Sequence, residues 1–312
     1  MDLPLPTPEQ PFRIGTRGSP LALWQAHEVR RSLIQCFALP EQAFEINVIK
    51  VTGDQVLDRA LKDIGGKGLF TREIEEALLA GQIDIAVHSM KDMPTLQPIG
   101  LILDCYLPRE DTRDAFVSPK VSRLADLPHG ARVGSSSLRR RAQLLHRRPD
   151  LDLVEFRGNV QTRMQKLENG VAEATFLAMA GLNRLGLAHM ARGPIEVDFM
   201  LPAVAQGAIG VERREDDPRA AKMLAAIHHG PTGQQLTAER AFLAQLDGSC
   251  ETPIAGLAVL DGDAIWLRGE ILRPDGSRVI AGERRGHARD AQSIGRALAD
   301  DLLAQAGDGF FD

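Results

Sequence analysis

One cysteine of this chain lies where its thiol has no core to fill. Cys250 stands between a glycine and a proline in the stretch Leu246–Ile254, whose turn-forming residues favour neither a helix nor a strand. Cys36 and Cys105 instead lie in apolar runs, which predicts that both are small buried side chains. The sequence therefore leaves Cys250 as a candidate for thiol chemistry.

A lysine and an aspartate follow a strand-like run. Lys91 and Asp92 come just after the segment IDIAVHS and before a proline, which stops further strand pairing. Open parallel sheets bind ligands outside the carboxyl ends of their strands, so chemistry is expected at this pair. A Lys-Asp turn on the surface is a common alternative, which these two residues alone do not exclude.

Positive charge is concentrated in an otherwise acidic chain. The net charge of −5 disfavours binding of the whole molecule to nucleic acid or to an anionic membrane. Only 4% of the residues are aromatic, so the stacking groups of a single-strand nucleic-acid surface are missing. The concentrated arginines are Arg139, Arg140, Arg141, Arg147, Arg148, Arg157, Arg163 and Arg184.

These arginines favour a small polyanionic ligand, because a guanidinium group binds carboxylate or phosphate through two parallel hydrogen bonds. A solvated helix face accounts equally well for Arg141, Arg147 and Arg148. We expect no nucleic-acid partner.

The cysteines and the N-terminus predict the compartment. Three widely spaced cysteines cannot form a dense disulfide framework, and their odd number leaves a free thiol, which favours a reducing environment. The first residues carry an acid and prolines where a signal peptide needs basic residues and an apolar block, and no later run is long enough to span a bilayer. We expect a cytoplasmic protein with no membrane partner. The eight histidines show no metal-ligand spacing, so no metal is expected.

Two stretches of the chain share one local design. Residues 12–15 are typical of a short strand, after which Ser19 and a proline predict the start of a helix over 21–35. Residues 132–134, three serines and a predicted helix over 138–148 repeat this order. Each unit directs the N–H groups of a helix start beyond its strand, where an anion is favoured.

A second repeat relates residues 80–90 to residues 169–179, in which glycine, acid, apolar strand and methionine coincide. The two repeats together predict two α/β lobes of similar plan rather than one large sheet.

The C-terminal part has a different character. A predicted helix over 237–246 precedes the cysteine loop, and three strands over 254–260, 264–272 and 278–284 follow, joined by tight turns. A final helix is predicted over 290–306. These elements predict a small α+β domain that carries the cysteine loop near its start.

Taken together, these features resemble the porphobilinogen deaminase family of tetrapyrrole biosynthesis. Matching segments run from Arg13 to about Gly307, and so many collinear motifs are far more specific than any single one. The motifs are RIGTRGSPLALWQA, GGKGLFTREIE, DIAVHSMKDMPT, REDTRDAFVS, VGSSSLRRRAQL, RGNVQTRMQKL, AGLNRLGL, LPAVAQGAIGVE and GSCETPIAG.

The resemblance implies a transferase, a hydroxymethylbilane synthase, that joins four porphobilinogen molecules head to tail. Ammonia leaves at each addition, and hydrolysis releases the linear product for porphyrin and heme biosynthesis. The resemblance also implies a dipyrromethane cofactor that is attached to Cys250 through a thioether and serves as the primer. Loss of ammonia from porphobilinogen gives an electrophilic azafulvene, for which a thiolate is a suitable soft nucleophile.

Site residues are implied by the same motifs. Asp92 matches the catalytic acid, which protonates the departing amine and then, as a carboxylate, stabilises positive charge on the pyrrole. Every pyrrole unit carries an acetate and a propionate, which the arginines are expected to bind. The implied cofactor-binding residues are Cys250, Lys91, Ser89, Ser136, Ser137, Arg139, Arg140, Arg163 and Arg184. The implied substrate-binding residues are Arg17, Ser19, Gln25, Arg157 and Phe70.

The implied fold is α/β, with two lobes like those of type II periplasmic binding proteins and a small C-terminal α+β domain. Domain 1, with the catalytic aspartate, is predicted to combine residues 12–110 and 203–226. Domain 2, which is arginine-rich, is predicted to span 111–202, and domain 3, with the cysteine loop, 227–312. The family is usually monomeric, so we expect a monomer. Asp63 and Ser249 depart from the lysine and glycine usual in the family.

Two other classes of protein remain open from the residues. A non-enzymatic two-lobed binding protein for a small polycarboxylate would share the fold, because fold alone does not give function. Such a protein would need neither a covalent group nor Asp92. A thiol-dependent hydrolase or redox enzyme would need a base near Cys250 that the sequence does not display.

Overall fold

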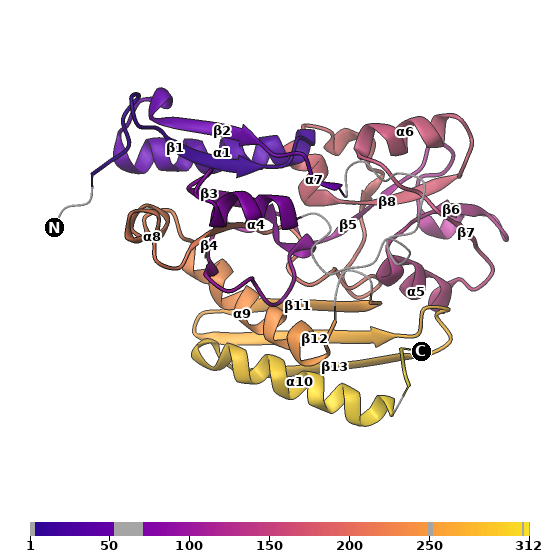
Figure 1. Ribbon diagram of the computed structural model, residues 1–312. Coiled ribbons are helices and arrows are strands. Elements are labelled where there is room, and N and C mark those ends of the chain that lie inside the picture. The colour runs from indigo at the N-terminus through magenta and orange to yellow at the C-terminus, as the bar shows by residue number, and fades with distance from the viewer. Residues whose placement is uncertain (1–3, 53–70, 249–251, 308, 312) are drawn as a thin grey trace. The chain divides into compact units, whose positions relative to one another are not determined.

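The structure is a computed structural model that describes residues 4–52, 71–248, 252–307 and 309–311 (Figure 1). The chain forms two compact units. The first combines Met1–Arg109 with Ala208–Gly233, and the second combines Glu110–Gly207 with Gln234–Asp312. The division into three domains stays a prediction.

A five-stranded mixed sheet organises the first unit, with the strand order β2-β1-β3-β10-β4. Strand β1 pairs in parallel with β2 and β3, whereas β10 runs antiparallel to β3 and β4. The carboxyl ends of β1 and β3 therefore lie at the same edge of the sheet. The strands are β1 (Phe12–Thr16), β2 (Phe44–Val48), β3 (Ile85–Ser89), β4 (Leu101–Tyr106) and β10 (Ile209–Arg214).

Helices cover both faces of this sheet, because alternate residues of a strand point to opposite faces. On β3, Ile85 and Val87 join a core with buried residues of α1 and α8, whereas Ala86 joins a second core with Ile74 and Leu78 of α4. The helical segments are α1 (Pro20–Phe37), η1 (Glu41–Ala43), α4 (Arg72–Leu79), η2 (Met90–Asp92) and α8 (Pro218–Ala225).

The second unit contains a sheet of the same plan, with the order β7-β6-β8-β5-β9. Strand β6 is parallel to β7 and β8, whereas β5 is antiparallel to β8 and β9. The strands are β5 (Asp114–Val117), β6 (Arg132–Gly134), β7 (Asp152–Val154), β8 (Ala174–Ala178) and β9 (Gly193–Pro194). The helical segments are η3 (Leu124–Asp126), α5 (Leu138–Arg147), α6 (Val160–Glu168), α7 (Met179–Arg184) and η4 (Ala188–Met190).

Both predicted repeats are confirmed by this shared plan. Strand β1 with α1 corresponds to β6 with α5, and the helices begin after Ser19 and Ser137, whose side chains accept hydrogen bonds from backbone N–H groups. Strands β3 and β8 also occupy the same place in their sheets. The predicted α/β fold class is therefore correct.

The second unit also holds a three-stranded antiparallel sheet in the order β11-β12-β13, as predicted. Helices α9 and α10 pack against one face of it (Figure 1). A Cβ at Gly269 of β12 would lie 2.5 Å from Cζ of Phe242 on α9, so the close approach of helix and sheet needs a glycine there. The elements are α9 (Gly230–Gln245), β11 (Ile254–Asp261), β12 (Ala264–Leu272), β13 (Val279–His287), η5 (Ala288–Asp290) and α10 (Ala291–Ala306).

One prediction about the cysteines is wrong. Cys105 is buried as expected, but Cys36 is exposed. It lies in the last turn of α1, whose buried face carries Ala26, Val29 and Leu33. By its spacing from Val29 and Leu33, Cys36 lies on the same face, but it stands in the last turn of the helix and is exposed there.

Candidate active site

Five of the predicted site residues of the first unit line one small pocket. Its volume is about 80 Å³, and it lies at the edge where β1 and β3 end. The predicted residues in its wall are Arg17, Ser19, Gln25, Ser89 and Asp92. The other lining residues are Leu21, Ala22, Thr71, Val87, His88 and Met93. This is the edge at which open α/β sheets bind ligands.

Asp92 is held by a short helical turn that leaves the end of β3. The turn η2 (Met90–Asp92) closes through a hydrogen bond of 3.2 Å from the Met93 N–H to the Met90 carbonyl. The Met90 N–H also donates to the carbonyl of Ala208, at 3.1 Å. A Cβ at Gly210 of β10 would lie 2.1 Å from Sδ of Met90, so this glycine leaves the space in which Met90 packs. The backbone beneath Asp92 is therefore fixed by the sheet.

Two polar side chains of the pocket fix each other. The Nε2 group of Gln25 donates to Oγ of Ser89 across 2.9 Å, and Gln25 is buried. Ser19 caps α1, because its Oγ accepts from the Ala22 N–H at 3.3 Å. The pocket wall therefore has a fixed arrangement of donors and acceptors.

The other predicted site residues near this pocket in the sequence, and the predicted cysteine, have different outcomes. Lys91 belongs to η2 but is not in the pocket wall. Phe70 and Cys250 lie outside the described residues.

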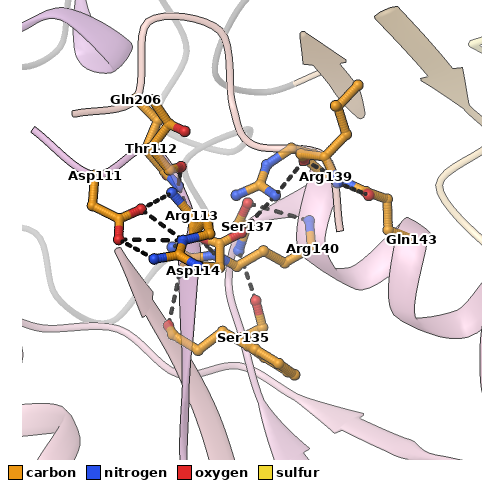
Figure 2. A network of polar contacts seen from close by, with 12 residues as sticks. Asp111, Thr112, Arg113, Asp114, Ser135, Ser137, Arg139, Arg140, Gln143 and Gln206 are labelled. Carbon is orange, nitrogen blue, oxygen red and sulfur yellow. Dashed lines mark hydrogen bonds and ion pairs between the residues drawn. The ribbon is translucent and has the colours of Figure 1, made fainter. Parts of the chain in front are cut away.

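The second unit contains a buried ionic network that includes Arg139 and Arg140, two of the arginines predicted to bind the cofactor. Asp114, at the start of β5, is fully buried, and the side chains of Arg139 and Arg140 on α5 are 4% and 7% exposed. Oδ2 of Asp114 accepts from Nη1 of Arg139 at 2.7 Å, and Oδ1 accepts from Nη2 of Arg140, also at 2.7 Å (Figure 2). Gln206 adds a bond of 3.0 Å to Oδ1.

This network fixes the charge state of its carboxylate. Burial alone would raise the pKa of Asp114, but the charges and hydrogen bonds of Arg139 and Arg140 hold that pKa well below its usual range. Both arginines also connect α5 to other parts of the unit. Arg139 donates a hydrogen bond to the Leu201 carbonyl, and Arg140 donates one to the Phe176 carbonyl. Arg139 and Arg140 are therefore parts of a rigid buried frame.

A second group of cations lies beside this frame. The pKa of Arg163 falls to about 10, because burial disfavours its charge and because Arg140 and Arg157 repel it. Nε of Arg163 donates to the Gly158 carbonyl at 2.9 Å, whereas Nε of Arg157 lies 3.7 Å from a carboxylate oxygen of Glu155. Cations that repel one another in a partly desolvated place are stabilised by an anionic ligand.

Other predicted residues of the second unit have structural contacts as well. Oγ of Ser136 accepts from the Phe156 N–H at 2.9 Å, and Ser137 caps α5. Nη2 of Arg184, which is largely buried on α7, donates to the Gly207 carbonyl at 2.7 Å.

For Arg141, Arg147 and Arg148, the sequence left open whether they bind a ligand or belong to a solvated helix face. In the structure, these arginines have contacts within the protein. Arg141 donates to the carbonyls of Ser135 and Leu153. Arg147 stacks over the ring of Phe199, and Arg148 forms two bonds to the carboxylate of Asp150. All three have structural partners, which favours the structural interpretation.

Several polar residues of these sites were not predicted. Asp114 and Gln206 complete the frame. His88 is among the residues that line the pocket, and its buried side chain lies 3.2 Å from Glu212. Asp114 is part of the quoted motif REDTRDAFVS, so an acid that opens a strand near an arginine-rich helix was an available signal.

The described part of the chain contains neither a membrane-spanning helix nor a cluster of metal-binding side chains. None of its helices combines the length and apolar character needed to cross a membrane. No group of three or more His, Cys, Asp or Glu side chains there could hold a metal ion.

Comparison with known proteins identifies relatives over almost the whole chain. The family model "Porphobilinogen deaminase, dipyromethane cofactor binding domain" matches residues 12–222, and "Porphobilinogen deaminase, C-terminal domain" matches residues 234–304. Porphobilinogen deaminase of Paracoccus denitrificans is 68% identical over 99% of this chain and 98% of its own length. The chloroplastic porphobilinogen deaminase of Pisum sativum is 53% identical over 96% and 83%.

Solved structures include more distant proteins. A periplasmic substrate-binding protein from Coxiella burnetii has 17% identity and a TM-score of 0.41, over 71% of this chain and 93% of that chain.

Proposed function

We propose that Asp92 and the arginines of the two units carry out the reaction of this chain. The chain belongs to the porphobilinogen deaminase family and is a hydroxymethylbilane synthase. The enzyme is a transferase of tetrapyrrole biosynthesis. Its family uses a dipyrromethane cofactor, as the matched model states. The main support for the catalytic and substrate-binding roles is one observation. Asp92 lies in a pocket that is also lined by Arg17, Ser19, Gln25 and Ser89.

Asp92 acts on the aminomethyl group of porphobilinogen. The carbon–nitrogen bond breaks, and ammonia leaves with a proton that the Asp92 carboxyl group supplies. The resulting carboxylate then stabilises the positive charge that spreads over the pyrrole ring. After the new carbon–carbon bond forms, the attacked ring carbon loses its proton to Asp92, which restores the acid for the next addition. Each cycle therefore joins one porphobilinogen and releases one ammonia.

Arg17 and Arg157 hold the acetate and propionate groups of the substrate, with Ser19, Gln25 and Phe70 assisting. Guanidinium groups suit this role, because each can bind a carboxylate through two hydrogen bonds. Arg17 does so from the pocket that contains Asp92.

The described residues also fit a polycarboxylate cofactor. Nε of Arg139 is buried without a hydrogen-bond partner among the described residues, and Arg163 is destabilised by its cationic neighbours. Both features are relieved by bound carboxylates. When bound, the cofactor supplies a free pyrrole carbon on which the chain is extended. The holding residues are Arg139, Arg140, Arg163, Arg184, Ser89, Lys91, Ser136 and Ser137, with Cys250 as the covalent attachment.

Covalent attachment can be tested by mass. The intact mass of the purified protein is expected to exceed the mass of the chain by one dipyrrole adduct, and Cys250→Ser is expected to remove the adduct. Cys36→Ser is the matched control, because that thiol is exposed and lies on another element. An unmodified protein with full activity would refute the assignment.

The substrate arginines can be tested by trapping intermediates. In Arg17→Leu or Arg157→Leu, elongation is expected to stall at particular stages, because the carboxylates of the lengthening product lose a cation. The stalled enzyme forms are expected to separate as discrete bands on a native gel. Arg123→Leu is the control, since that arginine is exposed and pairs with Asp126. A uniform small rise in KM without trapped bands is the result that contradicts this role.

The surroundings of the enzyme follow from the same assignment. We infer a cytoplasmic monomer that takes porphobilinogen from solution and needs neither nucleic acid nor a membrane. A non-enzymatic binding protein is not favoured, because the chain matches deaminases along nearly its whole length.

A further inference from the structure

A buried glutamine in the second unit binds the backbone of a segment that lies outside the strands and helices. Gln143 is on α5, one turn after Arg139, and is fully buried. Its Nε2 donates to the Leu201 carbonyl at 2.9 Å, and its Oε1 accepts from the Leu201 N–H at 2.8 Å. Leu201 is buried too, so its two backbone groups need partners within the protein. The proposed catalytic and binding roles do not include Gln143.

Arg139 binds the same carbonyl group. Its Nη1 donates to the Leu201 carbonyl at 2.9 Å and to Oδ2 of Asp114 at 2.7 Å, which uses both N–H bonds of that nitrogen (Figure 2). A guanidinium group is planar and rigid, so two acceptors on one nitrogen fix the direction in which its Nε points. Nε of Arg139 is buried and has no hydrogen-bond partner among the described residues. The position of the Leu201 carbonyl therefore helps to decide where this donor is available.

The chemistry of a glutamine side chain suits this contact. Holding both backbone groups of Leu201 needs a side chain that carries a donor and an acceptor, as an amide does. A carbonyl oxygen has two lone pairs, so the Leu201 carbonyl can accept from Gln143 and Arg139 together. The second bond, from the Leu201 N–H to Gln143, holds this residue at two points. Gln143, Leu201 and Arg139 therefore form one closed set of buried contacts.

We propose that Gln143 is a positioning residue for the dipyrromethane cofactor: by holding Leu201, it fixes the guanidinium of Arg139, whose Nε binds a cofactor carboxylate. This inference rests on the proposed role of Arg139 in holding the cofactor. Without the amide, the Leu201 backbone is free to turn, and Nη1 of Arg139 loses one of its two acceptors. The guanidinium then turns about its remaining bond to Asp114, and the donor for the carboxylate is no longer preorganised.

The rate of cofactor loading tests this proposal. Full-length protein is produced in cells that lack porphobilinogen and is then mixed with porphobilinogen, and intact mass follows the appearance of the dipyrrole adduct. Gln143→Met keeps the size of the side chain but removes both polar groups, and it is expected to slow loading by about 3- to 10-fold, the effect usual for one hydrogen bond. Gln165→Met is the matched control, because that amide is exposed on α6, and it is expected to keep the original rate.

Two further variants separate positioning from a loss of stability. Leu302→Ala removes buried atoms of α10 and lowers the unfolding temperature at a place remote in sequence from α5. Folded Gln143→Met is expected to load more slowly than folded Leu302→Ala. Because Gln143 acts through Arg139, the double variant with Arg139→Met is expected to load no more slowly than Arg139→Met alone.

The possible outcomes are distinct. A loading rate in Gln143→Met equal to that of the original protein or of Leu302→Ala overturns the proposal, as does a double variant slower than Arg139→Met. Should Gln143→Met not fold, Gln143→Glu is measured instead. Its carboxylate keeps the bond to the Leu201 N–H but cannot donate to the carbonyl and competes for Arg139, so an unchanged rate there also overturns the proposal. An original protein that gains no adduct and consumes no porphobilinogen contradicts the proposed function and, with it, this role.

Discussion

Replacement of Asp92 by asparagine is expected to reduce porphobilinogen consumption by about 10²- to 10⁴-fold, the range usual for loss of a general acid. Asparagine keeps the size and shape of the side chain but supplies neither a proton for the departing amine nor a negative charge for the cationic pyrrole. The fold is expected to persist, because the backbone of η2 is held by the bonds to Met90 and Met93 rather than by the carboxyl group. Ammonia release measures the loss of activity, and thermal unfolding measures whether the fold persists.

Asp104→Asn is the matched control for that experiment. Asp104 belongs to the same unit, is 41% exposed, and pairs with Arg213 at the surface. Its replacement removes the same charge away from the pocket and is expected to leave the rate within about twofold of the original, because exposed ion pairs contribute little. An Asp92→Asn variant that retained the full rate would show that the catalytic acid lies elsewhere.

Local pattern was enough to predict most of the fold. Ser19 with Pro20, and the serines before α5, mark helix starts by chemistry that acts within three or four residues. The two repeats then predicted a shared sheet plan, since similar local units close into similar sheets. Helix α9 begins earlier than predicted, at Gly230, because the residues GPTG are typical of a turn but also allow a proline in the first helical turn.

The polar interior of the sites could not be predicted in the same way. His88 and Glu212 are 124 residues apart, and Gln206 is 92 residues from Asp114. The first pair depends on the antiparallel strand β10, which enters its sheet beside β3, a strand distant in sequence. Gln206 lies in a turn outside the strands, so no strand pattern indicates its contact with Asp114. The sequence shows the charge of the arginine-rich segment but does not show which of its side chains are buried. In the structure, Arg139 and Arg140 already share an internal carboxylate.

Asp114→Asn is expected to destabilise the protein by about 3–5 kcal/mol, the usual cost of removing one partner of a buried ion pair. The variant leaves Arg139 and Arg140 with a neutral amide in a place from which water is excluded. Such a loss is a large part of the total stability of an ordinary domain. The midpoint of urea unfolding at neutral pH measures it.

The loss of stability in Asp114→Asn is also expected to depend on pH. The pKa of Asp114 is lower in the folded protein than in the unfolded chain, so the folded state binds fewer protons. Its contribution is therefore complete above the unfolded pKa of about 4 and is lost as the pH falls below that value toward the depressed folded pKa. The difference between the original protein and Asp114→Asn is expected to shrink on acidification.

Asp111→Asn provides the matched comparison within the same region (Figure 2). Asp111 also binds an arginine, at 2.8 Å, but the side chains of Asp111 and Arg113 are 20% and 35% exposed. Water can replace the lost partner there, so a loss of about 1 kcal/mol or less is expected. Equal losses in the two variants would show that burial of the Asp114 network has no special weight. The frame would then owe its rigidity to the packing of α5 rather than to its charges.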